Sequence, residues 1–140
     1  MHLRLVFDGM PLVVLQRIKP ALGSASDART IESLKSAIAP ISPPLESWIG
    51  LHDDRNVAWV HATVSTVVDV LQALSSTSTM HATSEQVHAT VVNVIEGRLD
   101  RLPLPQGSPC FCDRGRQYAD CHGRPSAPAR QRRTPRSRTP

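Results

Sequence analysis

Cysteine is absent from the first 109 residues of this 140-residue chain, and all three cysteines lie within the next twelve. Aromatic residues make up only 4% of the chain, so any core must be built mainly of aliphatic side chains. No uninterrupted run of about 18 apolar residues occurs, so we do not expect a membrane span. The sequence also lacks a Walker loop, a dinucleotide-binding fingerprint and the Gly-x-Ser-x-Gly and His-Glu-x-x-His motifs. These absences argue against the enzyme classes that those motifs define.

Charge is distributed unevenly along the chain. The net charge is +4, but residues 113–140 carry eight arginines and two acidic residues, whereas residues 1–112 carry eight basic and ten acidic residues. The basic character therefore belongs to the C-terminal end, and the body is mildly acidic. Residues 124–140 are rich in Pro, Arg, Ser and Thr, and a segment with so few apolar side chains cannot offset its ordering entropy. We predict that this tail is disordered.

Residues 1–100 are predicted to form a small helical body. Its clearest helix covers 55–74, where apolar residues recur at steps of three and four, with Asp53 or Asp54 as the N-terminal cap. The recurring residues are Val57, Val60, Val64, Val67, Leu71 and Leu74. A second helix over 84–99 begins at a capping-box pattern of Thr83 and Gln86, so the two predict an antiparallel helical hairpin.

Shorter helices are predicted upstream. Residues 27–39 have apolar residues on one face and end at a proline, and Ser42 followed by two prolines indicates the start of another short helix. Residues 1–20 are ambiguous, because their first part alternates like a strand and 11–19 could be a helix that ends at Pro20. Trp48 and Trp59 are expected to pack the core. The segment 101–108 contains Pro and Gly and is predicted to be a linker.

The cysteine cluster carries the specific chemistry. Cys110, Cys112, Cys121 and His122 offer three thiolates and one imidazole, which is the ligand set of a closed, four-coordinate structural zinc site. Gly115 can relieve the tight loop that must bring Cys121 and His122 back to the same ion. Four protein ligands leave no open position for water, which disfavours a catalytic zinc.

Two arginines and two aromatic residues fall inside the same stretch. Arg114 and Arg116 could offset the formal −1 charge of a zinc ion with three thiolates. Phe111 and Tyr118 supply the apolar side chains that such a small unit needs. The other histidines do not repeat a metal-ligand spacing, and we expect them to be solvated or at the edge of the core; they are His2, His52, His61, His81 and His88.

Other uses of the cysteines are open at this point. A disulfide framework is disfavoured by the odd number of cysteines and by the strain of bridging a Cys-x-Cys pair. A redox-active or catalytic thiol remains an alternative, although the chain has no Cys-x-x-Cys motif. Chance spacing within a disordered tail is a third reading.

Residues 109–123 resemble the SEC-C motif, a short zinc-binding module found at the C-terminus of the bacterial preprotein translocase ATPase SecA and appended to other bacterial proteins. The family pattern is roughly Pro-Cys-x-Cys-Gly-Ser-Gly-Lys-Lys-Tyr-Lys-x-Cys-(Cys or His)-Gly. The chain departs from it at Asp113, Arg114 and Gln117. The matching residues are Pro109, Cys110, Cys112, Gly115, Tyr118, Cys121, His122 and Gly123. The resemblance covers 15 residues, so it identifies a module within the chain.

The resemblance implies a non-catalytic docking module that binds one Zn²⁺ per chain. The implied partner is a protein of the chaperone or ribosome type, and we expect Arg114, Arg116 and Tyr118 to contact it. Cysteines kept reduced as metal ligands indicate a cytoplasmic protein. The alternative function is binding of RNA or DNA backbone through the zinc knuckle (residues 109–123) and the Arg-rich tail. An enzyme active site in residues 1–100 is a third alternative, without a supporting motif.

Overall fold

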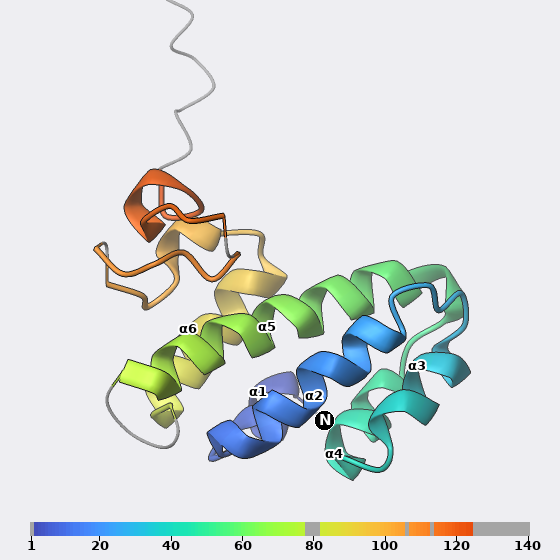
Figure 1. The fold of residues 1–140 in the computed structure, drawn as a ribbon. Helices are drawn as coiled ribbons and strands as arrows, with labels where there is room; N and C mark the ends of the chain where they lie inside the picture. Colours follow the sequence, from blue (N-terminus) through green and yellow to red (C-terminus); the bar gives the residue numbers. More distant parts are fainter. Residues whose placement is uncertain (1, 78–81, 106, 113, 125–140) are drawn as a thin grey trace, which may run out of the picture.

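The computed structural model describes residues 2–77, 82–105, 107–112 and 114–124 (Figure 1). Within these ranges the protein is mainly helical and contains no strand, as predicted. The described residues form six α-helices: α1 (Leu3–Phe7), α2 (Leu12–Ser24), α3 (Ile31–Ile38), α4 (Pro43–Ile49), α5 (Val57–Thr77) and α6 (Ser84–Ile95). The short 3-10 helix η1 (Asp54–Asn56) directly precedes α5, and two more, η2 (Leu99–Arg101) and η3 (Tyr118–Asp120), come after α6. His81 and the tail after Arg124 lie outside the described residues.

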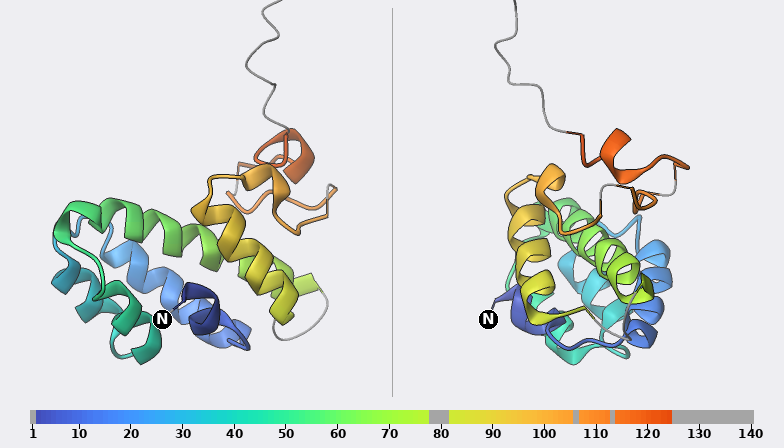
Figure 2. Two further views of the ribbon diagram at one scale, coloured as in Figure 1. Left: turned by 180° about the vertical axis from the view of Figure 1, so that it is seen from behind. Right: turned by 90° about the vertical axis from the view of Figure 1, so that its left-hand side faces the viewer.

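Helix α5 is the centre of the fold. It contacts α2 on one side and α6 on the other, and the two outer helices are separated by it (Figure 2). Its predicted apolar face is buried: Val60, Val64 and Val67 are fully inaccessible to solvent. β-Branched residues have low intrinsic helix propensity, so packing on both sides stabilises this helix.

Length and composition alone would allow α5 to cross a membrane. The segment Asp54–Ser75 has a mean hydropathy of 1.4, although a membrane span was not expected from the sequence. Half of its most apolar 18-residue stretch is buried inside the protein. Contacts on two sides require an apolar surface wider than that of a surface helix, which accounts for its composition.

Helix α6 confirms the predicted hairpin and its capping box. The Thr83 hydroxyl accepts from the Gln86 N–H, and the Gln86 side chain accepts from the Thr83 N–H. The helix ends at Ile95, four residues earlier than predicted. Gly97 then adopts a positive φ of 72°, which glycine reaches without a steric cost and which turns the chain into η2.

The N-terminal region contradicts the strand-like reading of its first residues and confirms the helix expected over 11–19, which is present as α2. Residues 3–7 form a helix, because Leu3, Val6 and Phe7 are the buried residues and follow a helical spacing. The prediction that Pro20 ends the next helix is wrong, since α2 continues to Ser24. Pro20 lies on the exposed side of α2, where water can hydrate the carbonyl group that loses its partner, while Leu22 beyond it is buried.

The short helices α3 and α4 begin at side-chain caps. Thr30 accepts from the Ser33 N–H, and Ser42 accepts from the Leu45 N–H as predicted. Trp48 on α4 is buried in the core. The expectation for Trp59 is wrong: its side chain is 44% exposed, at the edge of the core with its ring centroid 6.4 Å from that of Trp48.

Asp54 caps a different helix from the one predicted. Neither Asp53 nor Asp54 caps the helical segment that follows them. Instead, the Asp54 carboxylate accepts a 2.8 Å hydrogen bond from the N–H of Ile31, the first residue of α3. The bond joins segments 23 residues apart and places a negative charge at a helix N-terminus, where it is favourable.

The segment 101–108 is not a free spacer between the body and the knuckle. Leu102 and Leu104 are buried and belong to the same hydrophobic cluster as the helices. The alternation of leucine and proline places these two side chains against the body while Pro105 stays exposed. The predicted irregular backbone is present, but the two leucines attach this segment to the helical body.

We expect Asp54→Ala to lower the free energy of unfolding by about 1 kcal/mol, because it removes the charge-assisted cap of α3. Urea unfolding followed by circular dichroism measures this loss. The matched control is Asp53→Ala, which removes only an ion pair with Arg55. The side chains of this pair are highly exposed, 73% for Asp53 and 90% for Arg55, so the pair contributes little to stability. Equal losses in the two variants would contradict the assigned role of Asp54.

Candidate metal centre

A short hairpin positions the first two cysteines. The Cys110 N–H donates to the Arg116 carbonyl and the Tyr118 N–H donates to the Ser108 carbonyl, both at 2.8 Å. Gly115 turns the chain between these arms with a φ of +74°, which confirms the expected role of this glycine. Cys110 and Cys112 are two residues apart on one arm of this hairpin.

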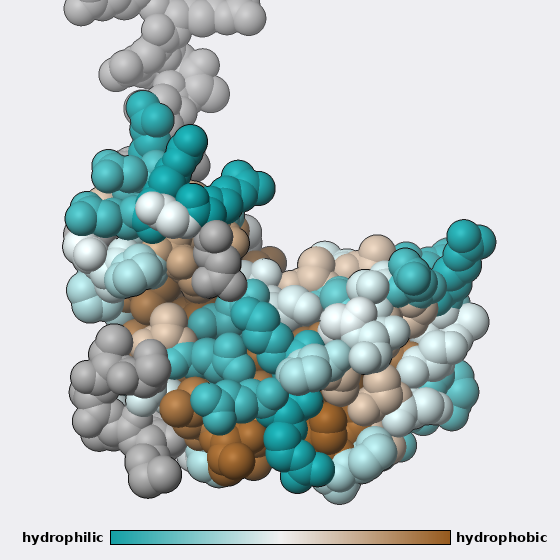
Figure 3. Space-filling view, viewed as in Figure 1, coloured by the Kyte–Doolittle hydropathy of each residue, from teal (hydrophilic) through white to brown (hydrophobic). Residues whose placement is uncertain are grey.

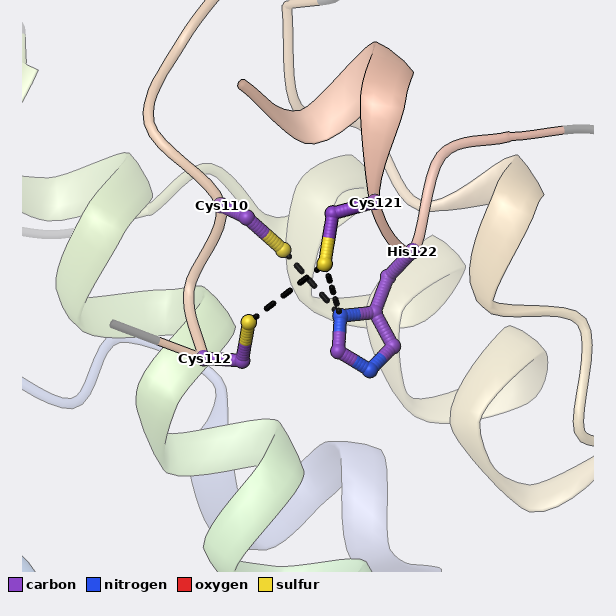
Figure 4. Close-up of side chains that lie close together, drawn as sticks. All are labelled: Cys110, Cys112, Cys121 and His122. Atoms are coloured by element: carbon purple, nitrogen blue, oxygen red, sulfur yellow. Dashed lines mark hydrogen bonds between the residues drawn. The ribbon is translucent and has the colours of Figure 1, made fainter. Parts of the chain in front are cut away.

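The helix η3 brings the other two ligands back. It spans Tyr118–Asp120, and its end is closed by a hydrogen bond from the Cys121 N–H to the Tyr118 carbonyl. Cys121 and His122 follow directly, and both side chains point toward the cysteines of the hairpin (Figure 4). The structure thus brings together all four residues that the sequence predicted as ligands.

The four ligand atoms lie within 4.8 Å of one another. The Sγ atoms of Cys112 and Cys121 are 3.5 Å apart, and the Nδ1 atom of His122 lies 3.1 Å from Cys110 Sγ and 3.4 Å from Cys121 Sγ. Ideal tetrahedral zinc with these ligands requires separations of roughly 3.5–3.8 Å. The cluster therefore fits a single ion of this kind after small adjustments.

The thiol groups of Cys110 and Cys121 differ in pKa. Burial disfavours the Cys110 thiolate, but N–H groups of the Cys112 and His122 backbone and the imidazole of His122 outweigh it and lower the pKa of Cys110 to about 6. Burial and the neighbouring Cys112 and Cys110 sulfur atoms raise the pKa of Cys121 to about 11. A thiol cluster of this kind favours a bound cation, because three adjacent thiolates otherwise repel one another.

The imidazole of His122 is held by its neighbours. Its ring lies against that of Phe111, with centroids 4.8 Å apart, and its Nδ1 atom faces the three sulfur atoms. Orienting a ligand ring in this way reduces the ordering cost of metal binding. The Arg114 and Arg116 side chains are exposed.

Tyr118 connects the knuckle to the helical body. Its side chain is completely buried, and its hydroxyl group donates to the Leu99 carbonyl and accepts from the Leu102 N–H. Burial raises the pKa of the Tyr118 phenol, so the hydroxyl keeps its proton at neutral pH. The expectation that Tyr118 contacts a partner is therefore corrected: a buried side chain with both hydrogen-bonding roles filled has a structural role.

Three of the described histidines outside the cluster bond to other groups. His61 Nε2 lies 2.7 Å from the Leu22 carbonyl, and His52 Nδ1 lies 3.0 Å from the Trp48 carbonyl. His88 lies 3.0 Å from the guanidinium group of Arg4. Within the described ranges, the knuckle holds the one group of potential metal ligands.

These features define a mainly helical protein with a Cys₃His cluster that could bind a metal. Residues 108–124 match the family model of the SEC-C motif, which confirms the resemblance for this segment. Searches of curated proteins and of solved structures found no match to the chain. The chain thus carries a SEC-C motif, which is a zinc-binding motif, behind a helical body.

We expect Gly123→Ala to destabilise the knuckle by about 1–3 kcal/mol. A Cβ atom at this position would lie 2.6 Å from two ring atoms of Tyr118 and 2.7 Å from its carbonyl oxygen, and the buried ring has no room to move. Loss of the Tyr118 amide signal in ¹⁵N-resolved NMR spectra during urea unfolding measures the effect. Gly107→Ala is the control, because an added Cβ there meets nothing within 4 Å. Equal stability of the two variants would contradict this packing.

Proposed function

We propose that this chain is a cytoplasmic, non-catalytic docking protein whose SEC-C knuckle binds one Zn²⁺ ion and presents a surface to a protein partner. The closed set of Cys110, Cys112, Cys121 and His122 is the observation that carries this proposal. When bound, zinc supplies folding free energy and rigidity. Four protein ligands leave no position for a reacting water molecule, which favours a structural role over catalysis.

The exposed face of the knuckle supports an acidic partner of the ribosome or chaperone type. Arg114, Arg116 and Arg124 are exposed on it, and five further arginines follow in residues 125–140. Cationic side chains on a rigid platform give electrostatic complementarity and fast association with an acidic surface. Tyr118 is excluded from this surface, since it is buried.

Binding of nucleic-acid backbone is the second candidate function. It is favoured by the concentration of arginine at the C-terminal end, where residues 125–140 contain five arginines and no acidic residue. Binding of this kind depends steeply on salt and requires little sequence preference. Salt dependence and removal of the tail therefore distinguish the two candidates.

We expect the purified protein to hold one zinc ion per chain and to bind it more weakly as the pH falls. At pH 7 the Cys110 thiol, with a pKa of about 6, is already largely ionised, whereas Cys121, with a pKa of about 11, keeps its proton. Zinc must displace at least that proton, so the affinity of the protein for zinc should fall by about tenfold or more for each unit by which the pH is lowered. Competition with a chromophoric chelator measures the affinity.

Elemental analysis and two histidine variants provide the control for zinc binding. His122→Ala removes a ligand and should lower zinc affinity strongly, whereas His88→Ala changes an exposed histidine on α6 and should leave it unchanged. A metal-free protein, or an affinity independent of pH, would be inconsistent with the proposed site.

Partner binding is tested by co-sedimentation with purified ribosomes and, separately, with a single-stranded RNA. We expect ribosome binding to require zinc, to weaken at least about tenfold in the double variant Arg114→Glu/Arg116→Glu, and to survive removal of residues 125–140. The matched control is Arg17→Glu/Arg29→Glu, which reverses two exposed charges on the helical body. RNA binding that is lost with the tail and falls steeply with salt would instead establish the nucleic-acid function.

A further inference from the structure

A groove of about 420 Å³ lies between the knuckle and the helical body. One wall is formed by α2 and α5, and the other is formed by residues 104, 105 and 108–111, which include the metal ligand Cys110. Figure 3 shows this face of the molecule, with hydrophobic atoms at the base of the knuckle above hydrophilic side chains of the helices. The volume is in the range of ligand pockets, roughly 300–1,000 Å³, and suits a short segment rather than a folded domain.

The walls of the groove are largely apolar. Leu74 and Leu104 are buried beneath it, while Leu12 and Phe111 are half-buried and Pro105 is exposed. Leucine, proline and phenylalanine surfaces that stay partly in contact with water gain free energy when an apolar ligand covers them. The lining therefore favours apolar side chains in the occupant.

The polar groups of the groove indicate a peptide backbone. Gln16 on α2 and Gln72 on α5 line it, and their side-chain amides form no hydrogen bond within the described part of the chain. Each amide offers both a donor and an acceptor, which is the complement of a peptide group. Two such amides beside apolar walls match an extended peptide better than a purely hydrocarbon ligand.

The described lining residues of the groove include one cationic and one anionic side chain. Lys19 and Asp69 line it and form an ion pair of 2.5 Å, with side chains that are 46% and 23% exposed. A charged ligand would have to compete with this pair, whereas an uncharged segment leaves it intact. The occupant is therefore expected to be uncharged where it crosses the groove.

We propose that this groove binds an extended, uncharged and apolar segment of the protein partner, with its backbone bonded to Gln16 and Gln72. The inference rests on the proposed docking function and adds the class of segment that is recognised. Because Pro109, Cys110 and Phe111 form one wall, the groove depends on the folded knuckle and therefore on the metal. Docking is then coupled to metal binding without any contact between the peptide and the ion.

The test uses the full zinc-loaded chain labelled with ¹⁵N and the capped peptide N-acetyl-Ala-Leu-Ala-Leu-Ser-amide as probe. We expect saturable shifts of the Gln72, Ala73 and Leu104 amide signals on titration. Replacing both leucines of the peptide by serine, or methylating its central backbone nitrogen, should weaken binding at least about fivefold, because each change removes one kind of contact. Removal of zinc should abolish the shifts.

Variants at the two glutamines make the result specific. Gln16→Ala/Gln72→Ala should weaken the probe at least about fivefold, and Gln117→Ala, which changes a glutamine outside the groove, should not. Absence of saturable shifts, equal affinity for the N-methylated peptide, or an unchanged affinity of the double variant would overturn the proposal. Binding that is seen only after removal of residues 125–140 would also overturn it, since the groove would then belong to the chain's own tail.

Failure of the groove and failure of the docking function give different results. If the probe does not bind but zinc-dependent ribosome binding persists in Gln16→Ala/Gln72→Ala, the groove proposal is wrong and the docking function stands. If neither the probe nor ribosomes bind the zinc-loaded chain, the docking function itself is wrong.

Discussion

The structure depends on one buried side chain, that of Tyr118. Its ring fills the contact between the knuckle and the body, and its hydroxyl group bonds to Leu99 and Leu102 just beyond α6. A buried hydroxyl that both donates and accepts fixes position in a way that apolar packing alone does not. Because Tyr118 also begins η3, the same residue determines where Cys121 and His122 lie relative to the helices. Tyr118 is not a candidate metal ligand, but it fixes the position of the four candidate ligands relative to the helical body.

The glycines of the motif serve this arrangement in two different ways. Gly115 is needed for its positive φ, although there is open space around it. Gly123 has an ordinary backbone and is needed because the Tyr118 ring fills the space beside its Cα atom. One position is constrained by the backbone and the other by volume, so a side chain at each would disturb the module differently.

The parts of the molecule that were predicted from sequence are those controlled by local spacing. The four metal ligands, the valine stripe of α5 and the caps at Ser42 and Thr83 all follow from residues a few positions apart. The errors have long-range causes: Asp54 caps a helix 23 residues away, and α2 continues through Pro20 because Leu22 is buried beyond it. No local pattern marks these partners, since each is selected by tertiary contacts.

The boundary between body and knuckle also differs from the prediction for a long-range reason. A segment of eight residues with two prolines and a glycine is typical of a spacer, and the burial of its two leucines becomes apparent only when the surface that covers them is known. Tyr118, which is expected from the sequence to contact a partner, is part of that covering surface. The four candidate ligands could therefore be predicted from the sequence, whereas the packing of the knuckle against the helical body could not.

The order of these contacts along the chain has a consequence for biosynthesis. Leu102 and Leu104 leave the ribosome before Tyr118, so the helical body is complete while part of its apolar surface is still uncovered. That surface becomes covered only when the segment that carries Tyr118 and the four candidate metal ligands has emerged. A newly made chain therefore exposes part of its apolar core until the knuckle has folded onto the helical body.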